Sequence, residues 1–201
     1  AGCGKVAHLH AKAIHNIKNA RLAGVWSRTP ETAREFASVY KTESYSDISG
    51  MVIENKTDLV IVCTPHPFHR QPAIGAAIAG ANVLVEKPLA SDLGDCDAII
   101  NACRERSVRL GVVSQRRWYS PSMRVKRAIE DGKIGKPVLA TITMLGWRDK
   151  AYYDADAWRG TWKDEGGGVL VCQSPHQLDL MLWYMGDVDE VYGLWRHLNH
   201  P

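Results

Sequence analysis

The feature of this sequence that most constrains its fold is the regular alternation of short apolar runs with longer amphipathic runs over residues 1–115. Short apolar runs predict strands, and the amphipathic runs between them predict helices. The predicted strands are 22–26, 59–63, 82–85 and 109–113, and the predicted helices are 8–17, 30–40, 72–79 and 92–106. Strands that alternate with helices form a parallel sheet covered by helices on both faces. We therefore expect an α/β domain with a doubly wound parallel sheet over residues 1–115.

The pattern changes after residue 115, which predicts a second domain over residues 116–201. Helices are expected over 121–131 and 176–185, and long strands rich in β-branched residues over 137–146 and 190–197. Long strands on either side of a helix predict an α+β domain with an open antiparallel sheet. Because two strands rarely form a stable sheet, we expect this domain to be incomplete at its C-terminal side.

Composition and charge exclude several classes of protein. The chain is 45% hydrophobic and 23% charged, as is typical of soluble globular proteins. A net charge of +3 with no block of like charges predicts no nucleic-acid partner. No apolar run approaches the length of a membrane helix, so we expect no membrane partner. Five cysteines without a Cys-x-x-Cys motif, and no secretory segment, indicate free thiols and a cytoplasmic location.

A glycine-rich motif opens the chain. Residues 2–7 (GCGKVA) match G-x-G-x-x-[GA]. In this motif Gly2 allows a tight turn, Gly4 lets the backbone approach a pyrophosphate, and the small Ala7 lets a helix pack on the sheet. The helix that follows presents unpaired N–H groups to phosphates. The motif normally follows a strand, and we expect that strand to be missing before residue 1.

The end of the next predicted strand bears on the choice of dinucleotide. Sites selective for NAD carry a carboxylate there, but residues 26–29 (WSRT) contain none. Ser27 and Arg28 occupy the position that meets the adenine ribose, and the Arg28 guanidinium suits a 2′-phosphate. This favours NADP, or use of both NAD and NADP, to a modest degree. An ordinary loop position is an equally open interpretation of Arg28, while Thr29 is suited to cap the helix that begins at Pro30.

Further polar residues follow another predicted strand. Thr64 and Pro65 end the strand over 59–63, with His66 and His69 just beyond. Ligands bind outside the carboxyl ends of strands in open α/β sheets. Two histidines three residues apart, with no acidic residue between them, do not by themselves indicate a metal, so we predict no metal site. A loop histidine with satisfied hydrogen bonds is the simpler interpretation of His66.

An acidic and a basic residue end the strand over 82–85. The sequence Glu86-Lys87-Pro88 places a carboxylate and an ammonium at the same edge of the sheet. A lysine in such a position can hold a reacting hydroxyl or carbonyl oxygen. The alternative interpretation is an exposed ion pair followed by a turn.

The second domain contributes a histidine beside a carboxylate. Three glycines at 166–168 precede a segment in which His176 and Asp179 share one face of a helix. A histidine of near-neutral pKa with an adjacent carboxylate is suited to proton transfer. A packed helix histidine is the alternative interpretation. Trp158 and Arg159 add a stacking surface and a cation upstream.

Together these motifs make the sequence similar to the Gfo/Idh/MocA family of NAD(P)-dependent oxidoreductases. The matching segments are GCGKVA (2–7), TP (64–65) with His69, EKP (86–88), QRRWYSP (115–121), GKIGKP (132–137), WRGTW (158–162) and GGGVLVCQSPHQLDLMLWYMG (166–186). The resemblance covers essentially the whole chain. Each segment is weak by itself, and their order and spacing carry the assignment.

The resemblance implies a Rossmann domain followed by an α+β domain with a large open antiparallel sheet. It implies hydride transfer between NAD or NADP and a hydroxyl or ketone carbon of a sugar, anhydrosugar or inositol. Lys87 and His176 match the catalytic positions and also lie at the substrate. Asp179 matches a substrate-binding position, and Trp158 and Arg159 are expected to reach cofactor or substrate. The implied cofactor contacts are Gly2, Gly4, Ala7, Ser27, Arg28, Thr64, Pro65, His69, Glu86, Lys87 and Gln115.

One position departs from the family pattern. Many members carry an aspartate four residues before the catalytic histidine, where this chain has Cys172. A thiol cannot replace a carboxylate as a charge partner unless its pKa is depressed. Either Asp179 orients the site, or the aspartate is dispensable in this subgroup. The segments QSPHQLDL and LWRHLNHP are most similar to members that act on pyranosides, including anhydrosugars such as levoglucosan.

Two other functions remain open. Some relatives use bound NAD for glycoside hydrolysis through transient oxidation, and others are non-catalytic dinucleotide-binding regulators. Regulators usually lose the lysine or the histidine that this chain retains at 87 and 176. The open sheet of the family often packs against another subunit, so we expect a homo-oligomer, either a dimer or a tetramer.

Overall fold

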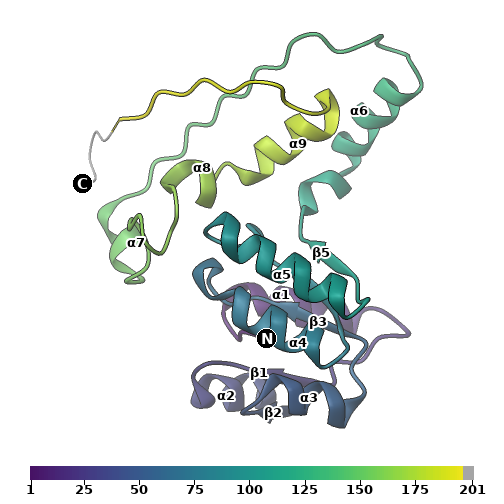
Figure 1. The fold of residues 1–201 in the computed structure, drawn as a ribbon, viewed down its shortest axis with the longest axis vertical. Coiled ribbons are helices and arrows are strands. Elements are labelled where there is room, and N and C mark those ends of the chain that lie inside the picture. Colours follow the sequence, from purple (N-terminus) through teal and green to yellow (C-terminus); the bar gives the residue numbers. More distant parts are fainter. Residues whose placement is uncertain (197–201) are drawn as a thin grey trace. The chain divides into compact units, whose positions relative to one another are not determined.

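The computed structural model describes residues 1–196 and divides the chain into two compact units, residues 1–113 and 114–201. The colours of Figure 1 follow the chain from the first unit into the second. The predicted domain boundary between residues 115 and 116 falls near this division.

The first unit alternates strands and helices. Its strands are β1 (Gly24–Trp26), β2 (Glu43–Tyr45), β3 (Leu59–Val62), β4 (Asn82–Val85) and β5 (Leu110–Val112). Its helices are α1 (Lys5–His15), α2 (Pro30–Tyr40), α3 (Ile48–Asn55), α4 (Arg70–Ile78) and α5 (Leu93–Glu105), with a short 3₁₀ turn η1 (His66–Phe68). Strand β1 pairs with β2, and β3, β4 and β5 form a second ladder in that order. All three strand pairs are parallel, which confirms the predicted α/β class.

The first two residues hydrogen-bond to both groups of strands. The amino group of Ala1 donates to the Ile61 carbonyl at 2.7 Å, and the Ala1 carbonyl accepts from the Cys63 N–H at 2.7 Å. The Gly2 N–H donates to the Trp26 carbonyl at 2.7 Å. The glycine motif is therefore anchored where β1 and β3 end. A cavity of about 610 Å³ between β1 and β3 is lined by Ala1 and Gly2 and by residues of α1, β1 and β3.

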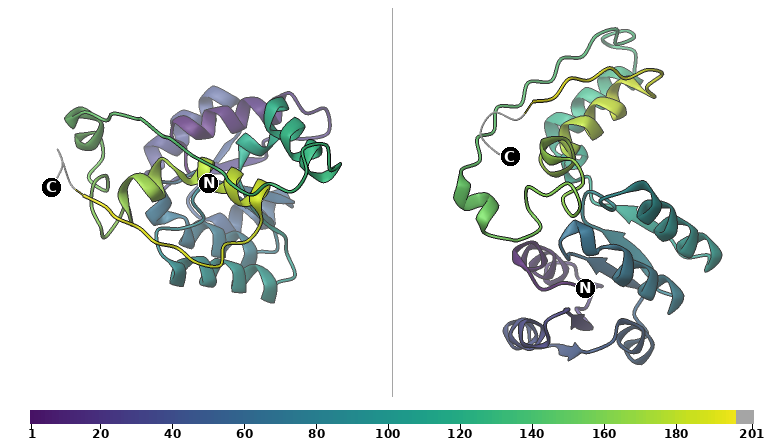
Figure 2. Two further views of the ribbon diagram at one scale, coloured as in Figure 1. Left: turned by 90° about the horizontal axis from the view of Figure 1, so that it is seen from above. Right: turned by 60° about the vertical axis from the view of Figure 1, so that its left-hand side comes forward.

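Two apolar cores hold the first unit together. One lies among α1, β1 and α2, and the other among α3, α4, α5, β3 and β4. Figure 1 shows α4 and α5 in front of the strands and α1 behind them, and the right-hand view of Figure 2 shows helices on both sides of the same strands. The continuous apolar strands of the sequence thus correspond to strands covered on both faces.

Most elements predicted in the first unit are present within a few residues of the expected bounds. The helix over 30–40 begins at Pro30 after the N-cap Thr29, although the Thr29 side chain makes no capping hydrogen bond. Strand β2 and helix α3 were not predicted. Strand β2 has only three residues, and they carry no apolar run. All five cysteines are free, as expected.

The described part of the second unit consists of helices and extended segments. The helices are α6 (Ser120–Glu130), α7 (Lys150–Asp154), α8 (Gly168–Cys172) and α9 (Pro175–Met185), preceded by a 3₁₀ turn η2 (Gln115–Trp118). Polar contacts join α6 to α9: Lys126 Nζ donates to the Trp183 carbonyl at 2.9 Å, and Tyr184 Oη donates to the Ser122 carbonyl at 3.1 Å.

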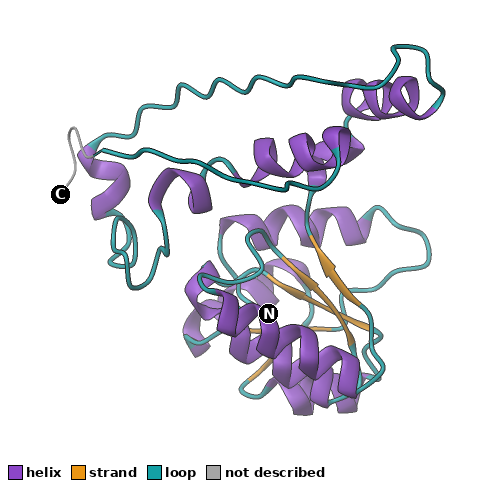
Figure 3. Cartoon of the chain, turned by 45° about the horizontal axis from the view of Figure 1, so that its top comes forward, coloured by secondary structure: helices purple, strands orange, loops and turns teal. Residues whose placement is uncertain are grey.

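The strands predicted over 137–146 and 190–197 are not present among the described residues. Residues 137–149 and 190–196 carry neither helix nor ladder pairing, and residue 197 lies outside the described range. Figure 3 shows every described strand within the first unit. A β-branched sequence favours extended backbone, but a strand exists only when a second strand satisfies its N–H and C=O groups. The strands predicted over 137–146 and 190–196 are therefore wrong for the described residues, whose backbone there has no ladder partner.

None of the helices in the described range is both long enough and apolar enough to cross a bilayer.

Candidate functional site

The glycine motif forms a turn that only glycine fits. Gly2 has a φ of +86°, and a Cβ there would lie 2.6 Å from the backbone nitrogen of Thr64. Gly4, the N-cap of α1, has no heavy atom within 4 Å of the position of a Cβ. Ala7 is buried against the sheet. A tight turn, open space beside Gly4 and a free helix N-terminus are the features that a pyrophosphate requires, so the predicted residues fit a dinucleotide.

Arg28 lies over an aromatic ring. Its Cζ is 3.7 Å from the centroid of Phe68, which is a cation–π contact. Arg28, Phe68, Arg70 and Asp95 line a cavity of about 530 Å³. The Ser27 hydroxyl accepts from the Thr29 N–H at 3.4 Å. A planar cation is therefore held at the end of β1, where the ribose and adenine of a dinucleotide would lie.

His69 links two loops at the carboxyl edge of the sheet. Its ring is 1% exposed. Nε2 lies 2.8 Å from the Thr64 carbonyl, and Nδ1 lies 3.0 Å from the Pro88 carbonyl. Burial lowers the pKa of His69, with hydrogen bonds to backbone carbonyls acting in the opposite direction. The ring ties the loop after β3 to the loop after β4, and its predicted contact with the cofactor stays a prediction.

Thr64 and Pro65 shape the loop after β3. Thr64 is buried, and its hydroxyl donates to the Phe68 carbonyl at 3.0 Å. Pro65 precedes η1, which places His66 in a buried position. Among the described residues, no group of three or more histidine, cysteine or acidic side chains could hold a metal.

Lys87 follows Glu86 directly after β4. The Glu86 N–H donates to the Val62 carbonyl at 2.9 Å, which continues the pairing of β4 with β3. One Glu86 oxygen lies 2.8 Å from His10 Nε2, and the other accepts from the Lys87 N–H at 3.2 Å. Neighbouring Cys63 and Glu86 raise the pKa of His10 to about 10. Burial opposes ionisation of Glu86, but its hydrogen bond and charge contact with His10 prevail and lower the pKa of the carboxyl.

His10 was not among the site residues predicted from the sequence. The available signal was its position in the helix after the glycine motif. It lies three residues after the buried Ala7 and one before the buried Ala11. A polar side chain on the buried face of a helix needs a hydrogen-bond partner. The partner is distant in sequence, so the pattern could not name it.

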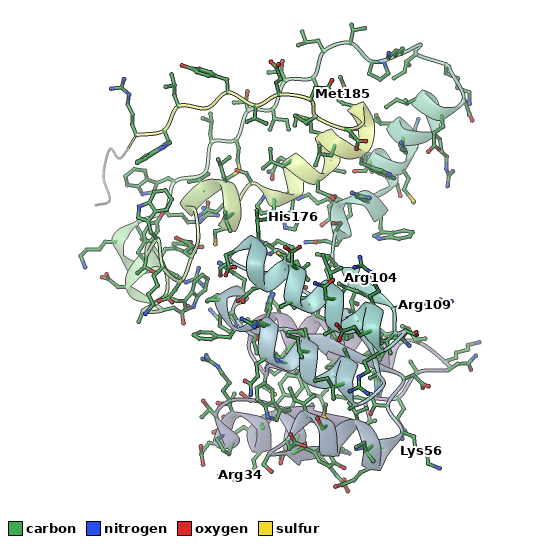
Figure 4. All side chains as sticks on the ribbon, in the orientation of Figure 1. Arg34, Lys56, Arg104, Arg109, His176 and Met185 are labelled. Carbon is green, nitrogen blue, oxygen red and sulfur yellow. The ribbon has the colours of Figure 1, made fainter. Side chains whose placement is uncertain are left out.

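His176 is the second residue of α9, and Figure 4 labels it at the start of that helix. The preceding N-cap residue Ser174 is buried, and its hydroxyl contacts the sulfur of Met144 at 3.4 Å. This contact ties the start of α9 to the extended segment before α7. The beginning of α9 therefore has a defined place within the second unit.

Asp179 is held by an arginine from its own unit. Arg117 Nε and one terminal guanidinium nitrogen donate to its two carboxylate oxygens at 2.8 and 2.6 Å. The side chains are 39% and 22% exposed for Arg117 and Asp179, respectively. The same guanidinium lies 5.5 Å from the Trp183 ring centroid. Arg117 is two residues after the exposed Gln115 and was not among the predicted site residues, because its short basic segment resembles an ordinary solvated surface.

Arg159 lies between two aromatic rings. Its Cζ is 4.7 Å from the centroid of Trp158 and 4.4 Å from that of Tyr152. Its Nε donates to Asp156 at 2.9 Å. Cys172, which stands where many family members have aspartate, lies 3.7 Å from Tyr152 Oη. Burial, and then the contact with Cys172, raise the pKa of Tyr152.

The parallel strands of the first unit, with a glycine turn wedged against the end of β3, define a Rossmann-type dinucleotide-binding domain. Residues 1–114 match the family described as an oxidoreductase family with an NAD-binding Rossmann fold, and residues 122–201 match the GFO/IDH/MocA C-terminal domain. The chain belongs to the Gfo/Idh/MocA family of oxidoreductases, which confirms the resemblance stated from the motifs.

Individual relatives agree with this assignment. The chain is 30% identical over 193 residues to myo-inositol 2-dehydrogenase of Thermotoga maritima, covering 95% of the chain and 55% of the relative. It is 29% identical over 161 residues to 2,7-anhydro-N-acetylneuraminate hydratase of Mediterraneibacter gnavus, covering 80% of the chain and 42% of that protein.

A solved structure supports the fold. The WlbA dehydrogenase of Bordetella pertussis, in complex with NADH and UDP-GlcNAcA, superimposes with a TM-score of 0.84 at 33% identity. The match covers 92% of this chain and 57% of that one. The chain thus spans about half the length of the relatives that it matches.

Proposed function

We propose that the protein transfers a hydride between a nicotinamide dinucleotide and a hydroxyl or ketone carbon of a sugar, anhydrosugar or inositol. The observation that carries the proposal lies within the first unit. The Gly2 turn touches the end of β3, and Lys87 follows the end of the neighbouring strand β4. A phosphate-binding turn and a lysine therefore share the carboxyl edge of one parallel sheet, where ligands of such sheets bind.

Each residue has its own role in the proposed hydride transfer. The bound nicotinamide supplies the hydride acceptor when the substrate carbon is oxidised. His176 accepts the hydroxyl proton, and the C–O bond becomes a carbonyl as the carbon loses hydride. Lys87 donates a hydrogen bond to the same oxygen and stabilises the charge that develops on it. Gly2, Gly4 and Ala7 seat the pyrophosphate.

The second unit supplies further substrate contacts in this proposal. Trp158 and Arg159 offer an aromatic face and a cation fixed by Asp156. Such a surface suits the apolar face and hydroxyl groups of a ring. Asp179, fixed by Arg117, contributes a carboxylate that accepts hydrogen bonds from hydroxyls. Gln115 and Thr64 belong to the cofactor side.

For the dinucleotide, we propose NADP or dual use. No carboxylate follows β1, and Arg28 is held at that position by its contact with Phe68. A guanidinium there can stack on adenine and meet a 2′-phosphate. Substitution of Arg28 by alanine is expected to weaken binding of NADP⁺ more than binding of NAD⁺. Equal losses for the two dinucleotides would assign Arg28 to the adenine alone.

A hydratase or glycoside hydrolase that uses the dinucleotide without net oxidation is the second candidate. One relative is a 2,7-anhydro-N-acetylneuraminate hydratase, so net dehydrogenation is not the only activity found among similar proteins. A non-catalytic regulator is the third, but this chain retains both Lys87 and His176.

The test uses the full-length natural protein with NAD⁺ or NADP⁺ and a panel of pyranosides, anhydrosugars and inositols. Reduced nicotinamide is followed by absorbance. We expect a rise with one class of sugar, and a loss of about 10²- to 10⁴-fold in kcat for Lys87→Ala and for His176→Ala. The exposed Lys12→Ala and His15→Ala serve as controls of the same residue types on α1.

The outcomes separate the candidates. Turnover of substrate without accumulation of reduced cofactor would support the hydratase or hydrolase. Tight dinucleotide binding without turnover of any substrate would support the regulator. Wild-type kcat in Lys87→Ala or His176→Ala would remove that residue from the mechanism.

We also propose assembly as a homo-oligomer. Apolar side chains of the extended segments, such as Val138, Leu145 and Tyr192, are exposed within the single chain. Exposed apolar surface of this kind favours association. Light scattering of the full-length protein would give the mass, and a monomer would contradict this proposal.

A further inference from the structure

We propose that His10 is a positioning residue for the catalytic lysine, because it holds Glu86 and thereby fixes the turn that presents Lys87. The inference goes beyond the proposed function and rests on it for the role of Lys87. His10 itself touches neither substrate nor cofactor in this proposal. It acts through the carboxylate that precedes the lysine in the chain.

The geometry forms a continuous path from α1 to the lysine. His10 Nε2 lies 2.8 Å from one Glu86 oxygen, and the other Glu86 oxygen accepts from the Lys87 backbone N–H at 3.2 Å. The His10 and Glu86 side chains are 22% and 17% exposed, respectively. A carboxylate that binds both groups at once fixes the backbone at the root of the lysine side chain. Because α1 also follows the glycine turn, the same helix anchors the phosphate site and the lysine turn.

A second histidine holds the other side of the same turn. His69 lies within hydrogen-bond distance of the Pro88 and Leu89 carbonyls, at 3.0 and 3.2 Å, and of the Thr64 carbonyl. Lys87 therefore lies between a carboxylate held by His10 and backbone carbonyls held by His69. These contacts restrict the backbone of the turn more than a surface loop requires. Such restriction is expected where a side chain must meet a reacting atom.

The contact between His10 and Glu86 is electrostatic as well as a hydrogen bond. The titratable groups that face His10 are Cys63 and Glu86, and Lys87 is the next cation along the chain. A partly buried carboxylate that loses its partner is costly. The Lys87 charge already acts on the Glu86 carboxylate. Loss of the His10 charge would strengthen the net pull of Glu86 on the Lys87 ammonium and draw the lysine away from the substrate oxygen.

The chain offers a matched control on the same helix. His8 is also partly buried, but its Nδ1 lies 2.9 Å from Tyr40 Oη and its ring is 4.6 Å from the Phe36 ring. His8 therefore packs toward α2, and His10 binds the loop after β4. Substitution of His8 removes a histidine of similar burial without touching Glu86.

The experiment compares His10→Asn, His10→Gln, His10→Ala and His8→Ala in the full-length protein. The longer Gln amide can donate to Glu86, whereas the shorter Asn amide cannot reach it. We expect kcat to fall by about 10²-fold in His10→Asn and His10→Ala, with dinucleotide affinity retained. We expect kcat of His10→Gln to lie between those of His10→Asn and the wild type, because Gln restores the hydrogen bond but not the charge. We expect His8→Ala to keep all of kcat, even if its thermal midpoint falls.

A double variant tests the charge argument. Replacing Glu86 by Gln in the His10→Ala background removes the unpaired carboxylate, so kcat should rise above that of His10→Ala alone. No recovery would show that the carboxylate is not the cause. If His10→Ala does not fold, the comparison of His10→Asn with His10→Gln decides.

Two results would overturn the inference while leaving the proposed function intact. One is a wild-type kcat in His10→Asn while Lys87→Ala remains inactive. The other is a loss of kcat in His10→Gln and His8→Ala that follows the loss of thermal stability. A wild-type kcat in Lys87→Ala would instead overturn the proposed function itself.

Discussion

The two units differ in what holds them together. All buried apolar residues of the described chain lie at or before Cys103, in the first unit, whereas the buried residues described in the second unit are Glu165 and Ser174. Polar links such as Arg117–Asp179 and Lys126–Trp183 join the helices of the second unit. Each strand of the first unit finds partners a few tens of residues away, and its helices cover both faces. The second unit has helices of the expected kind but extended segments without ladder partners.

The difference between the units shows when elements close in sequence are sufficient to form an apolar core. A βαβ unit buries its apolar residues against neighbours in sequence. An antiparallel sheet forms only where each strand has a hydrogen-bonding partner, and that partner can lie far along the chain. Substitutions at matched positions of the two units therefore test whether the units differ in stability as their burial predicts.

The largest expected contrast is between two apolar side chains of similar size. Ile99 is fully buried in α5, and Leu139 is 82% exposed in the second unit. In the 201-residue chain, Ile99→Ala should lower the free energy of unfolding by about 2–5 kcal/mol, because it leaves a cavity in the core. Leu139→Ala should change it by less than about 0.5 kcal/mol.

Urea unfolding followed by circular dichroism measures both variants, with amide hydrogen exchange assigning each transition to a unit. A loss above about 1 kcal/mol in Leu139→Ala would show that this segment is covered, and the contrast between the units would disappear.

A smaller contrast is expected between two helix caps of the same chemistry. Asp92 accepts from the Asp95 N–H at the start of α5, and Asp149 accepts from the Tyr152 N–H at the start of α7, both at 2.9 Å. Asp92→Ala should destabilise the first unit by about 1 kcal/mol. Asp149→Ala should only fray the five-residue helix α7, because opening that helix exposes no apolar core. Hydrogen exchange at the two helix starts distinguishes these results, and equal effects on global unfolding would contradict them.

A pH-dependent contrast concerns two ion pairs, one in each unit. The pKa of His10 is raised from 6.5 to about 10, so the stability that its charge contributes is complete below about pH 6.5 and is lost as pH rises through about 10. The pKa of Glu86 is lowered, so its contribution is lost only as pH falls through the acid range. Asp179 raises the pKa of Arg117, which therefore stays charged throughout.

The stability difference between wild type and His10→Gln should accordingly shrink between about pH 6 and about pH 10. The difference between wild type and Arg117→Gln should stay level over the same range. Chemical unfolding at several pH values measures both. A pH-independent His10 difference would show that His10 does not carry its charge in the folded protein.

The elements of the first unit follow closely from the sequence, because each has a local signature. Pro30 after Thr29 marks the start of α2, and the apolar run at 82–85 forms β4 with the expected bounds. Strand β2 was missed because three polar and aromatic residues carry no apolar run, and only pairing with β1 makes them a strand. The strands expected over 137–146 and 190–197 had the right composition, but a ladder depends on partners that composition cannot supply.

The residues of the candidate site likewise fall into those that the sequence predicted and those that it did not. The glycine motif and the Glu86-Lys87-Pro88 turn were identifiable because their function depends on residues adjacent in sequence. His10 and Arg117 were not, because each acts through a partner far along the chain: Glu86 is 76 residues from His10, and Asp179 is 62 residues from Arg117. His69 was expected at the cofactor, and its burial between two loops could be seen only once the loops were placed.

The alternation of strands and helices, the glycine turn and the family could all be predicted from the sequence, because they depend on local periodicity and on residue types at short spacing. Tertiary structure alone decided which side chains meet. It joined His10 to Glu86, Arg117 to Asp179 and His69 to the loop after Lys87, and it left the extended segments of the second unit without ladder partners. The physical reason is that hydrogen bonds and ion pairs act over a few ångströms, and only folding brings residues distant in sequence that close.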